Sequence, residues 1–273
     1  QYLAPSSCEI HAIAHIKILN LLKELVIAVQ AYFAAHRFIS RHNLWKWILI
    51  PGALYALLFI SGIWFFWTSS GEAIEYLFNL INLKGRLERI GWDFLNFILI
   101  LGTLMFRLIL LFFYFSLFKY IFLIIGSPVF AFLSEKTEAI LEGKDFPFSF
   151  QKLMSDIIRG IKLALRNSLW QTVYTISILL LSLIPLVGWI SPLIAFMVEC
   201  YYYGFSMLDY SCERHKLSPA QSITYISNRK GLAIGNGMIF FMLHLIPIVG
   251  WVLAPSYAVV AATISLYHQN ELK

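Results

Sequence analysis

The sequence predicts an all-α integral membrane protein with two long transmembrane helices, two re-entrant helical hairpins that reach half-way into the membrane, and amphipathic interfacial helices. The chain is 59% hydrophobic and only 13% charged, about half the charged fraction of an average soluble domain. Several apolar runs exceed the ~18 residues that identify a membrane-spanning helix. Two of these runs carry the same Pro-x-x-Gly interruption at their centre.

The N-terminal segment, residues 1–46, is expected to lie on the membrane surface. Residues 10–42 read as one amphipathic helix or a pair of helices. Their apolar stripe at helical spacing consists of Leu22, Leu25, Val26, Val29 and Phe33, and basic residues follow near the end. Residues 1–22 lack a compact apolar core before a small-residue cleavage site, so we expect no signal peptide there.

The remaining chain, residues 47–273, is predicted to form a single membrane domain with full spans at about 47–67 and 94–125. The first span contains Pro51 near its start and is flanked by tryptophans, which favour membrane interfaces. The second run of 32 residues would extend roughly 48 Å as a helix. We therefore expect it to tilt or project from the membrane, and to end at Gly126-Ser127-Pro128.

Two apolar runs near the C-terminus are near-copies of each other. Residues 183–192, Leu-Ile-Pro-Leu-Val-Gly-Trp-Ile-Ser-Pro, recur as Leu-Ile-Pro-Ile-Val-Gly-Trp at 245–251, with an offset of 62 residues. The breaks divide residues 172–204 and 235–267 into arms of roughly 12 residues, or ~18 Å, against a hydrocarbon core of ~30 Å. Broken helices at membrane depth are tolerated where protein or water covers their backbone groups, so each break is a candidate permeation or binding site.

The distribution of basic residues favours hairpins over crossings. If both broken runs return to the side they entered, that side carries 16 Lys and Arg against 3 in the 68–93 loop. If they cross, the division is 12 to 7. The positive-inside rule favours the first arrangement, a multi-pass protein with its basic loops in the cytoplasm.

Several segments together resemble the CysZ-type sulfate permease family and the related eukaryotic etoposide-induced membrane proteins. They are Arg37–Ser40 with Trp47–Pro51, Ser127-Pro128 with Leu133–Glu138, Leu208–Tyr210 with His215-Lys216, Gly235–Gly237, the second Ile-Pro break, and Pro255 with Ala258–Thr263. The resemblance extends from about Ala31 to Tyr267. It implies a bacterial inner-membrane homo-oligomer that admits sulfate for cysteine synthesis through paired half-membrane helices.

One motif departs from the family pattern. Where the family typically carries Pro-Gly-Leu-Arg-Arg, a motif associated with sulfate binding, this chain has His-Asn-Leu-Trp-Lys at 42–46. The glycine that would let the backbone approach an anion is absent, and Lys46 lacks the two-pronged contact of arginine. Arg41, His42, Asn43 and Lys46 are the candidate contacts for a small inorganic anion, sulfate or sulfite.

Two charged residues lie within apolar runs. Arg107 sits 13 residues into the long second run, where an isolated cation costs roughly 2.5–3.5 kcal/mol on insertion scales. We expect it to line an anion path or to pair with Glu199, and the alternative is a buried ion pair that fixes helix register.

The hairpin tips offer helix N-termini. Ser191-Pro192 fits an N-cap followed by proline in the first turn, and Ala254-Pro255 repeats the pattern without the hydroxyl. Such N-termini hold anions in transporters with broken helices. The alternative is a turn packed against neighbouring helices, with Trp189 and Trp251 filling space.

Glu135 and Glu138 lie three residues apart and so share a helical face. Paired carboxylates can perform acid/base chemistry, but an ion-pair network with Arg214, Arg229 or Lys230 is the favoured interpretation. Such a network could border a pore entrance.

The sequence offers little support for catalysis or for a metal. Asp209, Cys212 and His215 are spaced like metal ligands, but no second cluster completes a four-ligand set. Neither a phosphate-binding loop nor a nucleophile elbow occurs. We therefore expect no cofactor, no enzyme activity and no nucleic-acid partner.

Two hypotheses follow. The first is a channel or permease for a small oxyanion, most plausibly sulfate by resemblance, in contact with membrane lipid. The residues of its predicted path are Arg107, Glu135, Glu138, Ser191, Glu199, Asp209 and Ala254. The alternative is a non-transporting membrane organiser or tether of the same fold, which predicts a tight Arg107–Glu199 pair and basic segments that bind anionic lipid.

Overall fold

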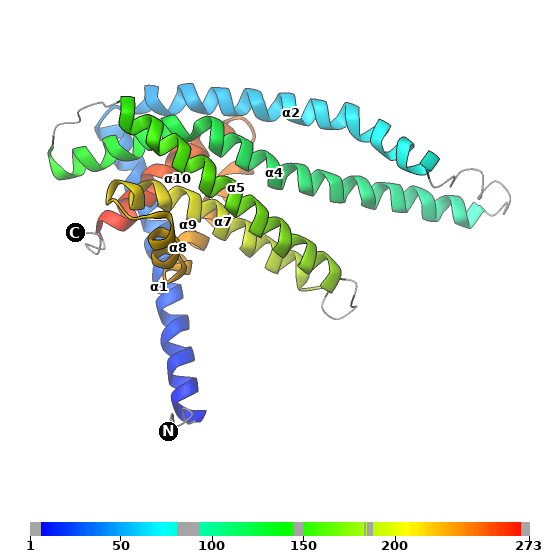
Figure 1. Cartoon of the computed structure of the whole chain (residues 1–273), viewed down its shortest axis with the longest axis horizontal. Coiled ribbons are helices and arrows are strands. Elements are labelled where there is room, and N and C mark those ends of the chain that lie inside the picture. Colours follow the sequence, from blue (N-terminus) through cyan, green and yellow to red (C-terminus); the bar gives the residue numbers. More distant parts are fainter. Residues whose placement is uncertain (1–6, 81–92, 145–149, 183, 185–187, 269–273) are drawn as a thin grey trace. The chain divides into compact units, whose positions relative to one another are not determined.

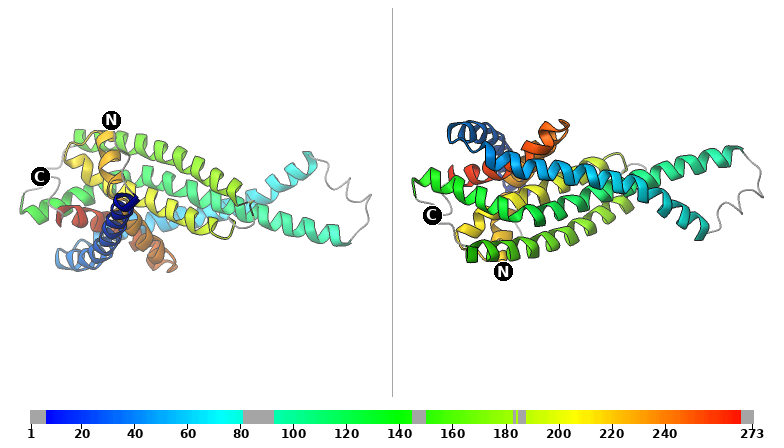
Figure 2. Two further views of the ribbon diagram at one scale, coloured as in Figure 1. Left: turned by 90° about the horizontal axis from the view of Figure 1, so that it is seen from below. Right: turned by 90° about the horizontal axis from the view of Figure 1, so that it is seen from above.

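The computed structural model describes residues 7–80, 93–144, 150–182, 184 and 188–268, and within them every regular element is a helix (Figures 1 and 2). In chain order the helices are α1 (Ser7–Arg41), α2 (Trp45–Leu80), α4 (Asp93–Glu142), α5 (Phe150–Leu181), α7 (Ser191–Arg214), α8 (Pro219–Ser227), α9 (Lys230–His244) and α10 (Val249–His268). The predicted all-α class is confirmed.

The chain divides into two compact units. The first comprises Gln1–Tyr55 and Phe122–Lys273, and the second comprises Ala56–Ile121. The second unit therefore consists of the later part of α2 and the first part of α4. In the first unit, α7, α9 and α10 pack against one another, α1 packs on α9 and α10, and α5 packs on α7.

Four helices in the described part of the chain are long and apolar enough to cross a membrane. They are His15–Arg41, Trp45–Glu72, Tyr120–Glu142 and Val249–His268. Their number and apolar character support the expected membrane protein. The half-membrane depth of the hairpins stays a prediction, and so does the surface position of α1.

The predicted helix end at Gly126-Ser127-Pro128 is wrong, because α4 continues through this segment to Glu142. A proline has no N–H for the carbonyl four residues earlier, which here belongs to Ile124. The Ser127 hydroxyl donates to that carbonyl oxygen at 2.8 Å and so replaces the missing bond. α2 runs without a break to Leu80, and the predicted bounds of the first span within it stay a prediction.

Both Pro-x-x-Gly breaks separate helices that pack against each other, α5 with α7 and α9 with α10. Pro185 lies outside the described residues. In the second break Ile248 adopts a left-handed conformation, with φ of 64°. The glycine of each copy lies against the end of the preceding helix: a Cβ on Gly188 or Gly250 would meet the carbonyl oxygen of Ser182 at 2.6 Å or of Leu243 at 1.8 Å. Glycine is therefore required for the chain to fold back so closely.

The two copies of the motif nevertheless end differently. The indole Nε1 of Trp251 donates to the His244 carbonyl at 3.1 Å and so satisfies a free acceptor at the end of α9. Trp189 is 91% exposed. The space-filling role predicted for both tryptophans is wrong for Trp189.

The predicted helix N-termini are only partly correct. α7 does begin at Ser191, but its N-cap is Ile190, and no side chain caps the helix. α10 begins at Val249, so Ala254 lies inside the helix and is fully buried. Ala254 was wrongly assigned as an N-terminus, because Pro255 sits in the helix interior rather than at its first turn.

Candidate functional site

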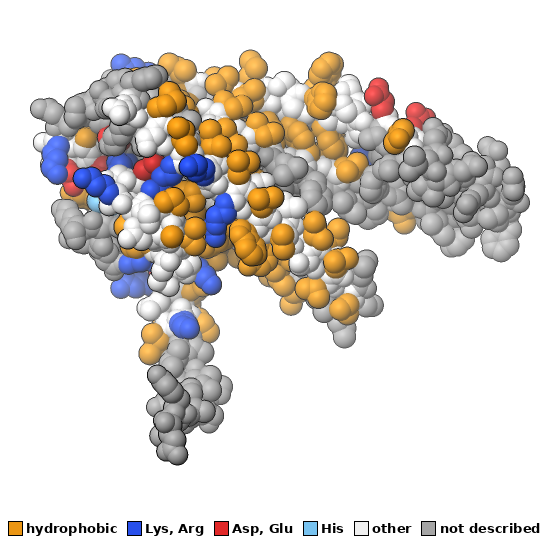
Figure 3. Space-filling model, viewed as in Figure 1, with side chains coloured by type: hydrophobic (Ala, Val, Ile, Leu, Met, Phe, Trp, Pro, Cys, Tyr) orange, Lys and Arg blue, Asp and Glu red, His pale blue; other side chains and the backbone are white. Residues whose placement is uncertain are grey.

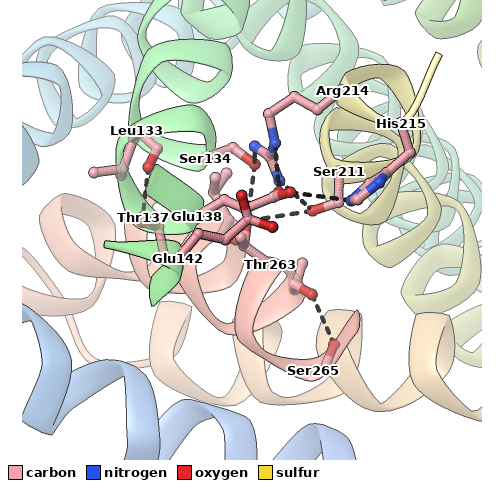
Figure 4. Close-up of polar contacts among 12 residues, drawn as sticks. Leu133, Ser134, Thr137, Glu138, Glu142, Ser211, Arg214, His215, Thr263 and Ser265 are labelled. Carbon is pink, nitrogen blue, oxygen red and sulfur yellow. Dashed lines mark hydrogen bonds and ion pairs between the residues drawn. The ribbon is translucent and has the colours of Figure 1, made fainter. Parts of the chain in front are cut away.

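The C-terminal end of α7 carries a cluster of buried charged residues, which we call the ion-pair cluster. α7 contributes Asp209, Glu213 and Arg214, and His215 follows directly after it. The partners come from α4, α5 and the segment around α8. Figure 4 shows the residues around Arg214. Because α7 packs tightly on α9, with a Cβ on Gly237 only 2.0 Å from the Cys200 carbonyl oxygen, the backbone that holds these residues is constrained.

One half of the cluster centres on Arg214 and Glu138 (Figure 4). Arg214 Nε donates to Glu138 Oε2 at 2.6 Å, and the His215 Nε2 lies 3.1 Å from Glu138 Oε1. The guanidinium also donates to the hydroxyls of Ser134 and Ser211. Thr263 on α10 joins the network through the Ser134 hydroxyl at 2.8 Å. The hydrogen-bond network around the Arg214 guanidinium therefore joins α4, α7 and α10.

The other half centres on Arg159 of α5. Its Nη2 lies 3.0 Å from Asp209 Oδ1 and donates to the Ser222 hydroxyl at 2.6 Å. Its Nη1 donates to the Leu217 carbonyl, and its Nε lies 3.6 Å from Glu213 Oε1. Arg159 thus joins α5, α7 and the start of α8.

Burial sets the electrostatics of the cluster. Burial raises the pKa of Asp209 above its usual value. The positive charge of Arg159 and the hydrogen bonds that Asp209 makes with Arg159 and Ser222 offset part of this rise. Burial likewise lowers the pKa of Arg214, and Glu138 opposes this shift. The three carboxylates face two guanidiniums and the His215 imidazole. An incoming anion would therefore have to displace a carboxylate from its arginine.

The structure confirms the ion-pair network predicted for Glu138 and Arg214. Glu135 lies one turn earlier on α4 and is half-buried. Arg229 instead stacks on the Tyr225 ring, 3.9 Å from its centroid. Asp209 contacts Arg159 instead, and among the described residues no group of three or more His, Cys, Asp or Glu side chains is arranged to hold a metal ion.

The candidate anion contacts Arg41, His42, Asn43 and Lys46 form an exposed turn between α1 and α2. Buried Leu44 anchors the turn, and its N–H donates to the Ile39 carbonyl at 3.1 Å. Asn43 has a φ of 54°, in the left-handed region that glycine and asparagine tolerate best. The turn thus keeps the conformation that glycine would allow, although Asn43 adds a side chain.

This turn contacts α4. Trp47, in the first turn of α2, packs on Phe132 of α4 with ring centroids 4.4 Å apart and the rings inclined at 39°. The Lys136 ammonium lies 5.3 Å from the Trp47 ring. Phe132 and Lys136 are four residues apart and share a face of α4, whereas Glu138 follows Lys136 by two residues and so points to another side of the helix.

The two charged residues found within apolar runs, Arg107 and Glu199, each have a described neighbour. In the second unit, Arg107 lies 5.5 Å from the Trp67 ring, and its Nη2 would be 3.7 Å from a Cβ on Gly71. In the first unit, Glu199 is buried and accepts a hydrogen bond from the side-chain amide of Gln171 on α5.

Gln171 belongs to a buried polar stripe on α5. Asn167, Gln171 and Thr175 are four residues apart, so they share a helical face, and all three are buried. The stripe follows α5 from the region of the ion-pair cluster toward the first hairpin tip.

Arg159 and Gln171 are functional candidates that the sequence analysis missed. The only available signal was the spacing of Lys152, Arg159 and Arg166, seven residues apart and hence on one face of α5. Their partners on α7 are 50 and 28 residues away in sequence, and no periodicity connects them.

Sequence comparison identifies the family of this chain. A profile of the family described as "Sulfate transporter CysZ/Etoposide-induced protein 2.4" matches residues 31–255. The chain belongs to this family. The resemblance read from the motifs is therefore confirmed.

Curated relatives are similar over most of their length. A protein named "Sulfate transporter CysZ" from Pseudomonas paraeruginosa is 27% identical over 231 residues, which cover 84% of this chain and 89% of the relative. Another of that name from Pectobacterium atrosepticum is 24% identical over 237 residues, covering 86% and 82% respectively. A Pseudomonas fluorescens protein of the same name is 30% identical over 143 residues, covering 52% and 57%.

Proposed function

We propose that this protein is a channel or permease for a small oxyanion, sulfate above all, in the bacterial inner membrane, where it serves sulfur assimilation and cysteine synthesis. Family membership and the names of the relatives support sulfate as the substrate. Basic side chains gather over the end of the first unit around α8, whereas hydrophobic side chains cover the α5–α7 hairpin toward its tip (Figure 3). This separation fits a cytoplasmic basic end.

The observation that carries the mechanism is the Arg214–Glu138 pair, whose side chains are only 9% and 14% exposed. Arg41, His42, Asn43 and Lys46 would gather the anion at the interface. An oxyanion that reached Glu138 would compete with its carboxylate for the Arg214 guanidinium, which suits two oxygens at once. The pair would act as an exchangeable gate, because a released Glu138 carboxylate would keep His215, whose Nε2 lies 3.1 Å from it, as a neighbour.

Beyond the gate, the polar stripe of α5 would lead toward Ser191 at the start of α7. Glu199 lies beside this stripe, and its bond from Gln171 would limit its repulsion of an anion. Glu135, Asp209 and Arg107 remain candidates along the path. Ala254 is removed from the proposal because it lies inside α10. Since the sequence has no ATP-binding motif, transport would be passive or coupled to protons.

A second candidate function is a non-transporting membrane organiser or tether. The observation that favours it is the exposure of the hairpin tips, where Trp189 and Leu245 are 91% and 82% exposed. Such tips would shape the bilayer or dock partners.

Uptake of radiolabelled sulfate into proteoliposomes distinguishes the two. Arg107→Ala and Lys46→Ala are compared with Lys162→Ala, which removes an exposed cation of α5 outside the proposed path. Uptake above that of empty vesicles, reduced in the first two variants and unchanged in the third, would support the permease. No uptake by correctly folded protein would favour the organiser.

A further inference from the structure

A groove of about 570 Å³ lies between α1 and the C-terminal end of α10. Ile27, Ala34 and Ile264 form apolar parts of its wall, while Arg37 and His268 are among its polar residues. Of the described residues that line the groove, none is acidic. The groove therefore combines a positive charge with an apolar wall.

The surface of α1 indicates which environment surrounds the groove. One face packs on α9 and α10. The next face is apolar yet exposed, and its residues lie at helical spacing: Leu22, Val26, Val29 and Phe33. Lys23, Gln30 and Arg37 recur every seven residues along the border of that face. Exposed apolar side chains beside a basic stripe are typical of a helix that lies at the lipid headgroup level.

The arrangement of α1 agrees with this position. Figures 1 and 2 show the axis of α1 at a steep angle to the α5–α7 hairpin within the first unit. If the hairpin points into the membrane, α1 lies close to the membrane plane. Its apolar stripe would then touch acyl chains, and the groove would open at the height of the lipid phosphates.

We propose that this groove binds the headgroup of an anionic phospholipid. The guanidinium of Arg37 and the side-chain amide of Gln30 would hold the phosphate, since arginine suits phosphate oxygens. The lipid tails would follow the apolar stripe of α1. A free oxyanion would match the positive charge but would leave the apolar wall and the rest of the volume unused.

The far end of the groove favours a headgroup hydroxyl over the phosphate. The C-terminal end of α10 carries partial negative charge. The His268 Nδ1 lies 2.9 Å from the Ile264 carbonyl oxygen, which can only accept, so Nδ1 donates; in the neutral imidazole this leaves Nε2 to accept from a hydroxyl. A glycerol headgroup supplies such a donor, so phosphatidylglycerol is the probe that fits best. The site does not depend on the proposed anion path.

Native mass spectrometry of the full chain in neutral detergent tests the site with short-chain phosphatidylglycerol. Arg37→Ala removes the charge, and Ala34→Phe fills the groove without changing charge. Lys17→Ala is the matched control, because it removes an exposed cation from α1 outside the groove. We expect one retained lipid per chain, with affinity roughly five- to tenfold weaker in the first two variants and unchanged in the control.

Three results would overturn the proposal. The first is equal binding by Arg37→Ala and the Lys17→Ala control, and the second is equal binding of phosphatidylcholine. The third is displacement of the lipid by sodium sulfate but not by sodium chloride of equal ionic strength, which would assign the groove to a free oxyanion. Arg37 is exposed, so its variant is expected to fold even if Ala34→Phe does not.

Discussion

Replacing Glu138 by glutamine tests both the stability and the gating role of the ion-pair cluster. Glutamine keeps the shape of the side chain and an oxygen that can accept from Arg214, but it removes the negative charge. The side chains of Arg214 and Glu138 are only 9% and 14% exposed. Loss of one member of a buried pair costs about 3–5 kcal/mol. Because Arg214 keeps Ser134 and Ser211 as acceptors, we expect a loss of about 2 kcal/mol.

The same substitution should strengthen anion binding at the gate. A carboxylate about 5 Å from a bound anion, at an effective dielectric constant of ~20, costs it on the order of 3 kcal/mol before screening. Allowing for screening and for the weakened cluster, we expect the apparent KM for sulfate uptake to fall roughly tenfold. Uptake into proteoliposomes measures this, and thermal unfolding in detergent should show a midpoint lower by roughly 5 °C.

Glu142→Gln is the matched control. It makes the same chemical change one turn later on α4, where the glutamate pairs at 2.6 Å with Lys144, whose side chain is 71% exposed. We expect neither the midpoint nor the KM to change in this variant. If Glu138→Gln behaves like Glu142→Gln in both assays, the pair is neither a stabilising contact nor a gate. A lowered midpoint with an unchanged KM would leave it a structural role alone.

Three further substitutions or reactions test other parts of the structure. Asn43→Gly should preserve the turn and sulfate uptake. Asn43→Val should lower the free energy of unfolding by about 1–2 kcal/mol, measured by thermal unfolding, because a β-branched residue resists a φ of 54°. Equal stability of the two variants would contradict the assigned conformation. Gly237→Ala should give aggregated or poorly folded protein on size-exclusion chromatography, since its Cβ would lie 2.0 Å from the Cys200 carbonyl oxygen, and a monodisperse variant would show that α7 and α9 are less close. Burial raises the pKa of Cys212 to about 12, so at pH 8 only about one thiol in ten thousand is ionised. In a Cys8→Ser background, maleimide should therefore label the chain only after denaturation. Rapid labelling of the folded protein would refute the burial.

The sequence was sufficient to locate the breaks but not every helix end. Pro-x-x-Gly predicted the separation of α9 from α10, because proline lacks the N–H that the helix needs and glycine permits the close return. The same reasoning failed at Pro128. There a neighbouring hydroxyl supplied the missing bond, and only the structure shows that the Ser127 side chain points to the Ile124 carbonyl.

In the candidate site, too, some contacts could be predicted from the sequence and others could not. Glu138 and its pairing with Arg214 could be predicted, since isolated carboxylates in a mostly apolar chain require cationic partners. The Arg159–Asp209 pair could not be predicted, because it depends on how α5 packs against α7. The left-handed turn at Asn43 was also not predicted, although asparagine is the residue that best replaces glycine in that conformation.

The difference between the two copies of the repeat makes one of them a natural optical probe. Trp251 is held by its hydrogen bond to the end of α9, so its surroundings are fixed by the fold. Trp189 is 91% exposed, and its fluorescence will depend on the medium around the first hairpin tip. The chain has eight tryptophans, so in a variant that keeps Trp189 alone, quenching by lipids brominated at different acyl positions would report the depth of that tip without an attached label.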